Sequence, residues 1–199
     1  MHKLHRVLCI AMRDLFLDGL PILDALEIGA STALAARWLN CDQSSISRTY
    51  RRASEQLGLN FRKTNGRYNA AGNLALLDSL RQASQLHRLS SGGQLLQWLL
   101  HPALALQPFL AALRPAAKPP LSCDWPEPQR LHNLLERRLV DLALLPAGSL
   151  GKRDAEASSD LTARRLRGDG PPLDALLRQD VAQHPAMQQL LEQLGSPQG

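Results

Sequence analysis

Apolar residues recur at helical spacing in the first half of the chain, and polar residues interrupt them at turn length. One stripe follows steps of four, three and four and predicts a buried helix face: Ile46, Tyr50, Ala53 and Leu57. Asp42 is a suitable N-cap for this helix, and Ser31 is one for a shorter helix over residues 32–39. Asn40 and Cys41 fit the turn between them. The pattern therefore predicts a helix-turn-helix unit.

Over residues 43–51 the opposite face of the second helix is polar or basic and carries no carboxylate. It carries Ser44, Ser47, Arg48 and Arg51, with Gln43 at the exposed first turn. Amide, hydroxyl and guanidinium groups are those that read base edges and hold phosphates. We therefore expect residues 43–57 to form a recognition helix that binds double-stranded DNA. Gln43 and Ser44 would approach base edges, while Ser47, Arg48 and Arg51 would cover bases or adjacent phosphates.

A hairpin is predicted next, over residues 61–68 (FRKTNGRY), because Asn65-Gly66 is a strong two-residue turn signal. Arg62, Lys63 and Arg67 flank the turn, where they would meet DNA phosphates. The alternative is a basic surface hairpin that does not contact DNA.

Residues 73–89 contain no proline or glycine and predict a long helix. A second stripe in it has the four-three-four spacing of a coiled-coil seam: Leu76, Leu80, Ala83 and His87. We expect a homodimer through this linker helix. The alternative is that the stripe packs on its own domain. The run Ser-Ser-Gly-Gly at residues 90–93 reads as a hinge.

Beyond the hinge, short apolar runs alternate with helical patterns, which predicts a small parallel sheet. The expected strands of this sheet are 94–100, 121–125 and 140–145, and a returning strand is expected over 173–177. The expected helices are 102–113, 129–139 and 186–194. Residues 148–172 are rich in Gly, Ser, Asp and Arg and predict a flexible loop. An amphipathic helix is expected within residues 1–19, as an extension before the DNA-binding domain.

Charge strengthens the DNA hypothesis. Between Thr32 and Tyr68 seven Arg and Lys residues stand against two acidic ones, an excess equal to the +5 of the whole chain. Such a localised basic patch is typical of proteins that bind a polyanion, although a solvated helix face is the simpler alternative.

Other function classes have little support in the residues. Three cysteines far apart argue against a disulfide framework and for a reducing cytosol, so we expect a cytoplasmic protein. No apolar run reaches 18 residues, which argues against membrane insertion. Scattered histidines and the absence of a nucleophile motif or a phosphate loop argue against an enzyme, and we expect no cofactor. His5 and Cys9 lack a third ligand, so no metal site is predicted.

The helix-turn-helix residues also carry a family resemblance. Ser31, Ala35-Ala36, Leu39, the run Gln43 to Arg48, Leu57-Gly58 and Ala71-Gly72 resemble the winged-helix domain of LysR-type transcriptional regulators. The resemblance covers roughly residues 20–90. Ala53-Ser54 departs from the Leu-Glu usual there, and the segment between Gly58 and Gly72 is short, which indicates a trimmed wing.

A second resemblance concerns the first half of that family's effector-binding domain. Asp141 to Ala143 matches its Asp-Leu-Ala strand, with Arg138 in place of the usual glycine, and residues 172–194 resemble its closing strand and helix. In the family the linker helix pairs two subunits, and a small effector binds between two subdomains. Here most of the second subdomain is missing between Leu145 and Leu173, so a small-molecule effector is doubtful.

The expected fold is therefore mainly α: a winged helix-turn-helix domain with a linker helix, followed by a small truncated α/β domain. The domains would span 1–19 (helical extension), 20–72 (DNA-binding), 73–91 (linker and dimerisation) and 92–199 (reduced effector-like domain). The expected function is that of a sequence-specific DNA-binding transcriptional regulator with reduced or absent sensing. The alternative is a protein-interaction module that heterodimerises with related regulators and sequesters them.

Overall fold

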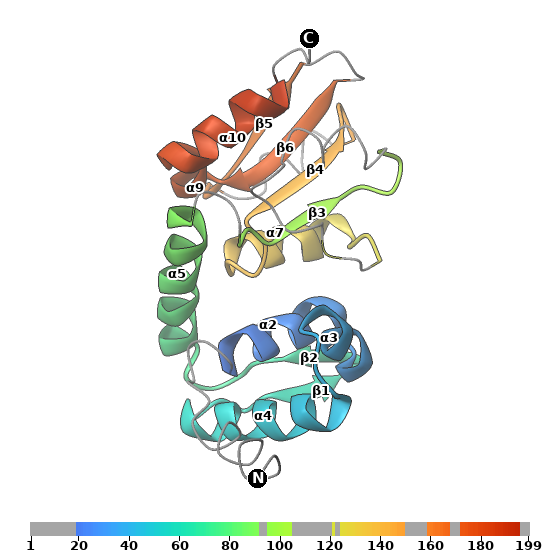
Figure 1. Cartoon of the computed structure of the whole chain (residues 1–199), viewed down its shortest axis with the longest axis vertical. Helices are drawn as coiled ribbons and strands as arrows, with labels where there is room; N and C mark the ends of the chain where they lie inside the picture. The colour runs from blue at the N-terminus through green and yellow to red at the C-terminus, as the bar shows by residue number, and fades with distance from the viewer. Residues whose placement is uncertain are drawn as a thin grey trace, which may run out of the picture. The chain divides into compact units, whose positions relative to one another are not determined.

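The computed structural model describes residues 19–91, 95–104, 121, 124–149, 159–167 and 172–195 (Figure 1). The chain divides into two compact units, Met1–Arg81 and Gln82–Gly199. The helix expected within residues 1–19 lies almost wholly outside the described residues, and so does most of the helix expected over 102–113. No described helix is both long and apolar enough to cross a membrane.

The first unit contains helices α2 (Leu20–Gly29), α3 (Thr32–Trp38) and α4 (Gln43–Gln56), strands β1 (Arg62–Thr64) and β2 (Arg67–Asn69), and the beginning of α5 (Leu74–Ser90). Both predicted caps are confirmed. The Ser31 hydroxyl oxygen accepts the backbone N–H of Leu34 at 3.4 Å, and Asp42 Oδ1 accepts that of Ser45 at 2.7 Å. These caps satisfy N–H groups that the first helical turn leaves without partners, and thereby set where α3 and α4 begin.

The core of this unit lies between α2, α3 and α4. Ile46, Ala53 and Leu57 are buried as predicted, whereas Tyr50 is only half-buried. They pack in one cluster with residues of the other elements, among them Leu23, Leu26, Ala35, Phe61 and Leu77. Ala35 is fully buried, and its small side chain permits the close packing of α3. The buried stripe of α4 therefore fixes which of its faces remains exposed.

The hairpin β1–β2 is antiparallel, with Arg62 opposite Asn69 and Thr64 opposite Arg67. Asn65 and Gly66 both have positive φ, 52° and 77°, as a two-residue type I′ turn requires. The predicted hairpin is thereby confirmed. Each strand is only three residues long.

The second unit is built on a four-stranded sheet in the order β3-β4-β6-β5, with β3 (Trp98–Leu100), β4 (Leu142–Pro146), β5 (Leu161–Leu166) and β6 (Leu173–Arg178). Strands β3 and β4 are parallel, but β6 is antiparallel to both β4 and β5. The parallel sheet predicted over residues 94–145 is confirmed for β3 and β4, and the returning strand β6 joins it in the antiparallel direction. Only six residues separate β5 from β6, which suits an antiparallel neighbour, whereas a parallel return needs a long crossover.

Two further expectations for this unit need correction. Strand β5 lies inside the segment predicted to be a flexible loop. It was not predicted because three of its four central residues are exposed and only its ends, Leu161 and Leu166, are buried. Residues 121–125 were expected to form a strand, but the described ones do not. The backbone N–H of Leu121 donates to the carbonyl oxygen of Trp98 at 2.9 Å, and no longer ladder follows among the described residues.

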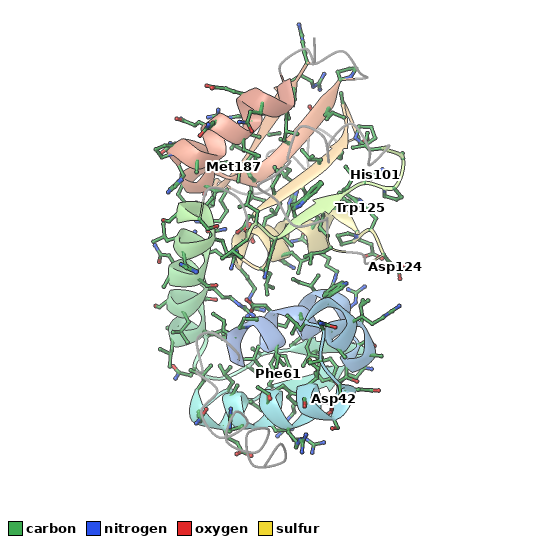
Figure 2. All side chains as sticks on the ribbon, in the orientation of Figure 1. Asp42, Phe61, His101, Asp124, Trp125 and Met187 are labelled. Carbon is green, nitrogen blue, oxygen red and sulfur yellow. The ribbon has the colours of Figure 1, made fainter. Side chains whose placement is uncertain are left out.

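Helices α7 (Pro128–Glu136), α9 (Gln179–Gln183) and α10 (Pro185–Gly195) pack on this sheet. Alternate strand residues, such as Leu142, Leu144 and Leu177, share one apolar cluster with Met187 and three leucines of α10. Figure 2 shows Met187 on α10, and it is fully buried. Leucines of α7 are also buried but lie outside that cluster, and we assign α7 to the opposite face. The predicted helices over 129–139 and 186–194 are confirmed within a few residues.

Helix α5 buries a different stripe from the one predicted. Its buried residues are Leu77, Arg81, Gln85, Arg88 and Leu89. Leu76, Ala83 and His87 are exposed, and Leu80 is partly buried against the core of the first unit. Among the described residues, the alternative that the whole 76-80-83-87 stripe packs on its own domain is therefore not observed. Dimerisation through it stays a prediction.

Candidate nucleic-acid interface

The first turn of α4 is organised by the carboxylate of Asp42. Its Oδ1 accepts the hydroxyl of Ser44 at 2.6 Å and the backbone N–H of Ser45 at 2.7 Å, and its Oδ2 accepts the hydroxyl of Ser45 at 2.7 Å. These hydrogen bonds, the Ser44 hydroxyl foremost, hold the pKa of Asp42 well below its usual range. The Ser44 hydroxyl donates its hydrogen to Asp42, so toward DNA it can act only as an acceptor.

The Gln43 side chain is also held. Its Nε2 donates to the hydroxyl oxygen of Thr32, at the first position of α3, across 2.6 Å. Gln43 itself is exposed. Both groups that the sequence proposed as base readers, Gln43 and Ser44, are thus oriented by neighbours before any ligand arrives.

The remaining predicted positions of α4 follow its exposed side. Arg48 and Arg51 are exposed, whereas Ser47 is half-buried. Arg48 Nη2 lies 3.4 Å from the Ser44 hydroxyl oxygen and 3.5 Å from that of Ser45, so its guanidinium extends back over the first turn. Arg51 lies over the ring of Tyr50, 5.8 Å from its centroid. Two of the cations of α4 are therefore placed on the same side as Gln43 and Ser44.

An aromatic cluster joins the hairpin to α4. The ring centroids of Tyr50, Phe61 and Tyr68 lie 5.7–5.9 Å apart pairwise. Burial raises the pKa of Tyr68, so its hydroxyl stays neutral at ordinary pH. Figure 2 marks Phe61 in this region. Ser54 adds a polar link, because its hydroxyl donates to the carbonyl oxygen of Leu59 at 2.7 Å and accepts the backbone N–H of Phe61 at 3.4 Å.

The three hairpin cations do not act as one set. Register places Arg62 and Arg67 on one face of the hairpin and Lys63 on the other, opposite Tyr68. The Lys63 ammonium lies 5.6 Å from the centroid of the Tyr68 ring, within cation–π range. The sequence grouped these residues by proximity alone. The side-chain alternation of the strands separates them.

Sequence reasoning missed Thr32, which holds Gln43, and Ser54 and Tyr68, which join α4 to the hairpin. Tyr68 carries a detectable signal, since it lies two residues after the hairpin turn at a position that faces α4. Ser54 was noted only as a departure from the usual Leu-Glu pair. The Thr32–Gln43 contact joins side chains 11 residues apart, so no helical spacing rule could indicate it.

The acidic residues of α2 do not compete with the basic surface. Asp24 and Glu27 are buried, and both face Arg81 of α5. Arg81 Nε donates to Asp24 Oδ1 at 2.8 Å, and its Nη2 lies 3.2 Å from Glu27 Oε1. Burial opposes the charge on Arg81, but the two carboxylates outweigh it and raise the pKa of the guanidinium. The net positive charge on the surface of this unit is therefore retained.

The second unit has a comparable buried ion pair at Asp141. Its carboxylate accepts Arg88 Nε and Nη2, both at 2.8 Å, Gln85 Nε2 at 2.9 Å and the backbone N–H of Gln97 at 2.9 Å. Arg138, where the resembled family has glycine, has a φ of 60°. Its guanidinium contacts Gln85 and Asp180. Arg138 therefore adopts the left-handed backbone conformation that glycine favours.

At the carboxyl end of β3, His101 forms an edge contact with Trp125, with ring centroids 4.7 Å apart (Figure 2). His101 Nδ1 accepts the backbone N–H of Ala103 at 3.1 Å. Across the described part of the chain, no three His, Cys, Asp or Glu residues gather as they would around a metal ion.

No protein-family model matches the chain, and no curated protein matches it. Solved structures do match. A full-length OxyR variant from Pseudomonas aeruginosa is 18% identical, with a TM-score of 0.44, over 78% of this chain and 56% of that one. CrgA, a LysR-type transcriptional regulator from Neisseria meningitidis, is 24% identical, with a TM-score of 0.32, over 75% and 52%.

Full-length LysG from Corynebacterium glutamicum with bound effector Arg is 16% identical, with a TM-score of 0.33, over 75% of this chain and 54% of that one. The chain thus spans about half the length of the solved structures it matches. The solved structures that this chain matches are LysR-type transcriptional regulators, the family that its residues 20–90 resemble.

Proposed function

We propose that this chain is a sequence-specific DNA-binding transcriptional regulator of the LysR type, with a winged helix-turn-helix domain whose helix α4 enters the major groove. The observation that carries the proposal is the exposed side of α4. Near its N-terminus it presents the amide of Gln43, the hydroxyl of Ser44 and the guanidinium groups of Arg48 and Arg51. The capping carboxylate of Asp42 is engaged by serine hydroxyls and a backbone N–H, and Glu55 lies in the last turn. That set of groups suits base edges and phosphates.

The predicted residues then divide into groups that contact bases and groups that contact phosphates. Gln43 and Ser44 lie at the first turn, where a helix in the groove comes nearest to the bases. Ser47, Arg48 and Arg51 cover adjacent bases or phosphates. Arg62 and Arg67 hold the phosphate backbone from one face of the hairpin, and Lys63 holds it from the other.

The proposal is tested by separating base reading from phosphate holding. Gln43→Ala should lower affinity for the operator by about 1–3 kcal/mol and leave nonspecific binding almost unchanged. Arg67→Ala should weaken binding to every duplex alike and reduce the slope of log affinity against log salt by about one unit. Both variants are titrated with salt on operator and scrambled duplexes. If Gln43→Ala weakens both duplexes equally while operator preference persists, α4 does not enter the groove as proposed.

Dimerisation through α5 is part of the proposal. Leu74, Leu76 and Leu86 are the large apolar residues exposed among the described residues, and all three lie on α5. The seam would comprise Leu76, Leu80, Ala83 and His87. Leu76→Glu places a charge in this seam without touching the core, whereas Leu80 also contacts the core of its own unit. Leu76→Glu should sediment as a monomer with unchanged helix content, with Asp78→Asn as an exposed control. A dimer that persists would place the interface elsewhere.

Sensing is proposed to be reduced or absent. The turn after β3, Leu100-His101-Pro102, offers no hydroxyl for an anionic ligand. A thermal-shift screen of metabolites should give no saturable stabilisation, and one that rises with concentration to a plateau would contradict this.

A second candidate function is a protein-interaction module that pairs with related regulators through α5 and sequesters them. The exposed leucines of α5 and the three-residue hairpin strands favour it. A gel shift with random duplex DNA at low salt distinguishes the two candidates. A DNA-binding regulator shifts the duplex through phosphate contacts even without its operator, and a sequestering module does not.

A further inference from the structure

The contact between Thr32 and Gln43 joins the two helices at the positions where each begins. Thr32 is the first residue of α3 and Gln43 is the first residue of α4. Ser31 caps one helix and Asp42 caps the other, so both backbones are fixed at these positions. The 2.6 Å hydrogen bond therefore connects two side chains whose backbone positions are fixed by the helix caps.

The chemistry of the amide gives this bond a consequence. A glutamine side chain offers two N–H donors on Nε2 and one carbonyl oxygen. Thr32 accepts one of these N–H groups, so one N–H donor and the carbonyl oxygen remain for a ligand. Adenine presents the matching pair in the major groove, with N7 as acceptor and the N6 amino group as donor. Guanine presents two acceptors, N7 and O6, so the free carbonyl oxygen of Gln43 would face O6 without a hydrogen between them.

We propose that Thr32 is a positioning residue that sets the base preference of Gln43, by holding its amide in the orientation that accepts adenine and disfavours guanine. The inference rests on the proposed DNA-binding function and deepens it. Without the Thr32 hydroxyl, the exposed Gln43 side chain rotates freely and can turn either of its N–H groups toward a guanine acceptor. Nonspecific affinity is unaffected, because Thr32 carries no charge to hold phosphate.

The test selects bound sequences from a random duplex pool, with wild type and two variants. Thr32→Val keeps the shape of the side chain and removes the acceptor, whereas Thr32→Ser keeps the hydroxyl. Wild type should prefer adenine over guanine at one base pair of the site by about tenfold or more. Thr32→Val should reduce that ratio by about fivefold at this base pair alone, and Thr32→Ser should retain it.

Two further measurements separate a positioning role from a structural one. Thr32→Val should bind scrambled duplex as wild type does and unfold at the same temperature within a few degrees. In a Gln43→Ala background, Thr32→Val should change no base preference, because the group it orients is gone. A variant Thr32→Val with the wild-type preference overturns the inference and leaves the proposed function standing. A preference that changes equally in the Gln43→Ala background also overturns it. A wild-type protein that selects no sequence overturns the proposed function instead.

Discussion

Helix α5 carries two buried arginines that are held in different ways. Arg81, in the first unit, faces two carboxylates, Asp24 and Glu27, but its Nη1 has no hydrogen-bond partner among the described residues. Arg88, in the second unit, pairs with the Asp141 carboxylate at two points. Two further N–H groups donate to the Ser84 hydroxyl at 2.9 Å and the Arg138 carbonyl oxygen at 3.0 Å. Arg81 is therefore held mainly by two opposite charges, and Arg88 by one described carboxylate with several hydrogen bonds.

The difference shows two ways to keep a guanidinium in a protein interior. Moving an ion out of water costs several kcal/mol, which opposite charge or well-formed hydrogen bonds must offset. At Arg81 a second carboxylate supplies the offset. At Arg88 the Asp141 carboxylate pairs in bidentate geometry, and two further oxygens, of Ser84 and Arg138, accept hydrogens of the guanidinium. The two sites should therefore differ in how much they depend on any one acidic residue.

The largest effect is expected from Asp141→Asn. The change removes the one carboxylate that the described contacts give Arg88 and leaves a buried cation, which should lower the free energy of unfolding by about 3–5 kcal/mol. Urea unfolding followed by the fluorescence of Trp98 and Trp125, both in the second unit, measures it. Asp160→Asn, at an aspartate whose side chain is 61% exposed, is the control and should change little. A loss below about 1 kcal/mol at Asp141 would show that the hydrogen bonds alone hold Arg88.

Asp24→Asn should cost less, about 1–3 kcal/mol, because Glu27 remains to balance Arg81. Trp38 reports on this unit in the same urea titration. The double variant Asp24→Asn with Glu27→Gln should then approach the loss seen for Asp141→Asn. Equal losses for the two single variants, Asp24→Asn and Asp141→Asn, would remove the distinction between the sites.

The smallest effect is expected at the rim of the second site. Burial alone would raise the pKa of Asp180, but Arg138 and Arg178 outweigh it and lower that pKa below the ordinary value. Because the pKa is lower in the folded state, Asp180 stabilises the fold at pH values above its unfolded-state pKa, near 4. This stabilisation is lost as the pH falls through the folded-state pKa. Asp180→Asn should therefore cost at most about 1 kcal/mol at pH 7, since the side chain is half-exposed, and nothing near pH 2. Thermal unfolding across this range measures it. A cost that grows toward low pH would contradict the assignment.

Local elements of the first unit could be predicted because their signals are local. Ser31 and Asp42 cap helices within a few residues, and Asn65-Gly66 encodes its own turn. The exposed side of α4 followed from its apolar stripe. The candidate site was predicted as a set of exposed polar residues, without the contacts that orient them.

The buried arginines could not be predicted in this way. A prediction from periodicity counts only apolar residues, so it does not recognise Arg81 and Arg88 as members of the buried face of α5. Their partners Asp24 and Asp141 lie 57 and 53 residues away in sequence. The same reasoning explains the missed strand β5, whose central residues are stabilised by pairing with β6 and not by an apolar pattern of their own.

That strand has a consequence for the protein in concentrated solution. Among the described strands β5 is an edge of the sheet, and an open edge is a template on which another chain can add. Arg164 is exposed there, and Arg165, whose side chain is 48% exposed, pairs with Asp174 of the neighbouring strand. Like charges brought together by two such edges would repel each other. We therefore expect Arg164 and Arg165 to disfavour aggregation through this edge.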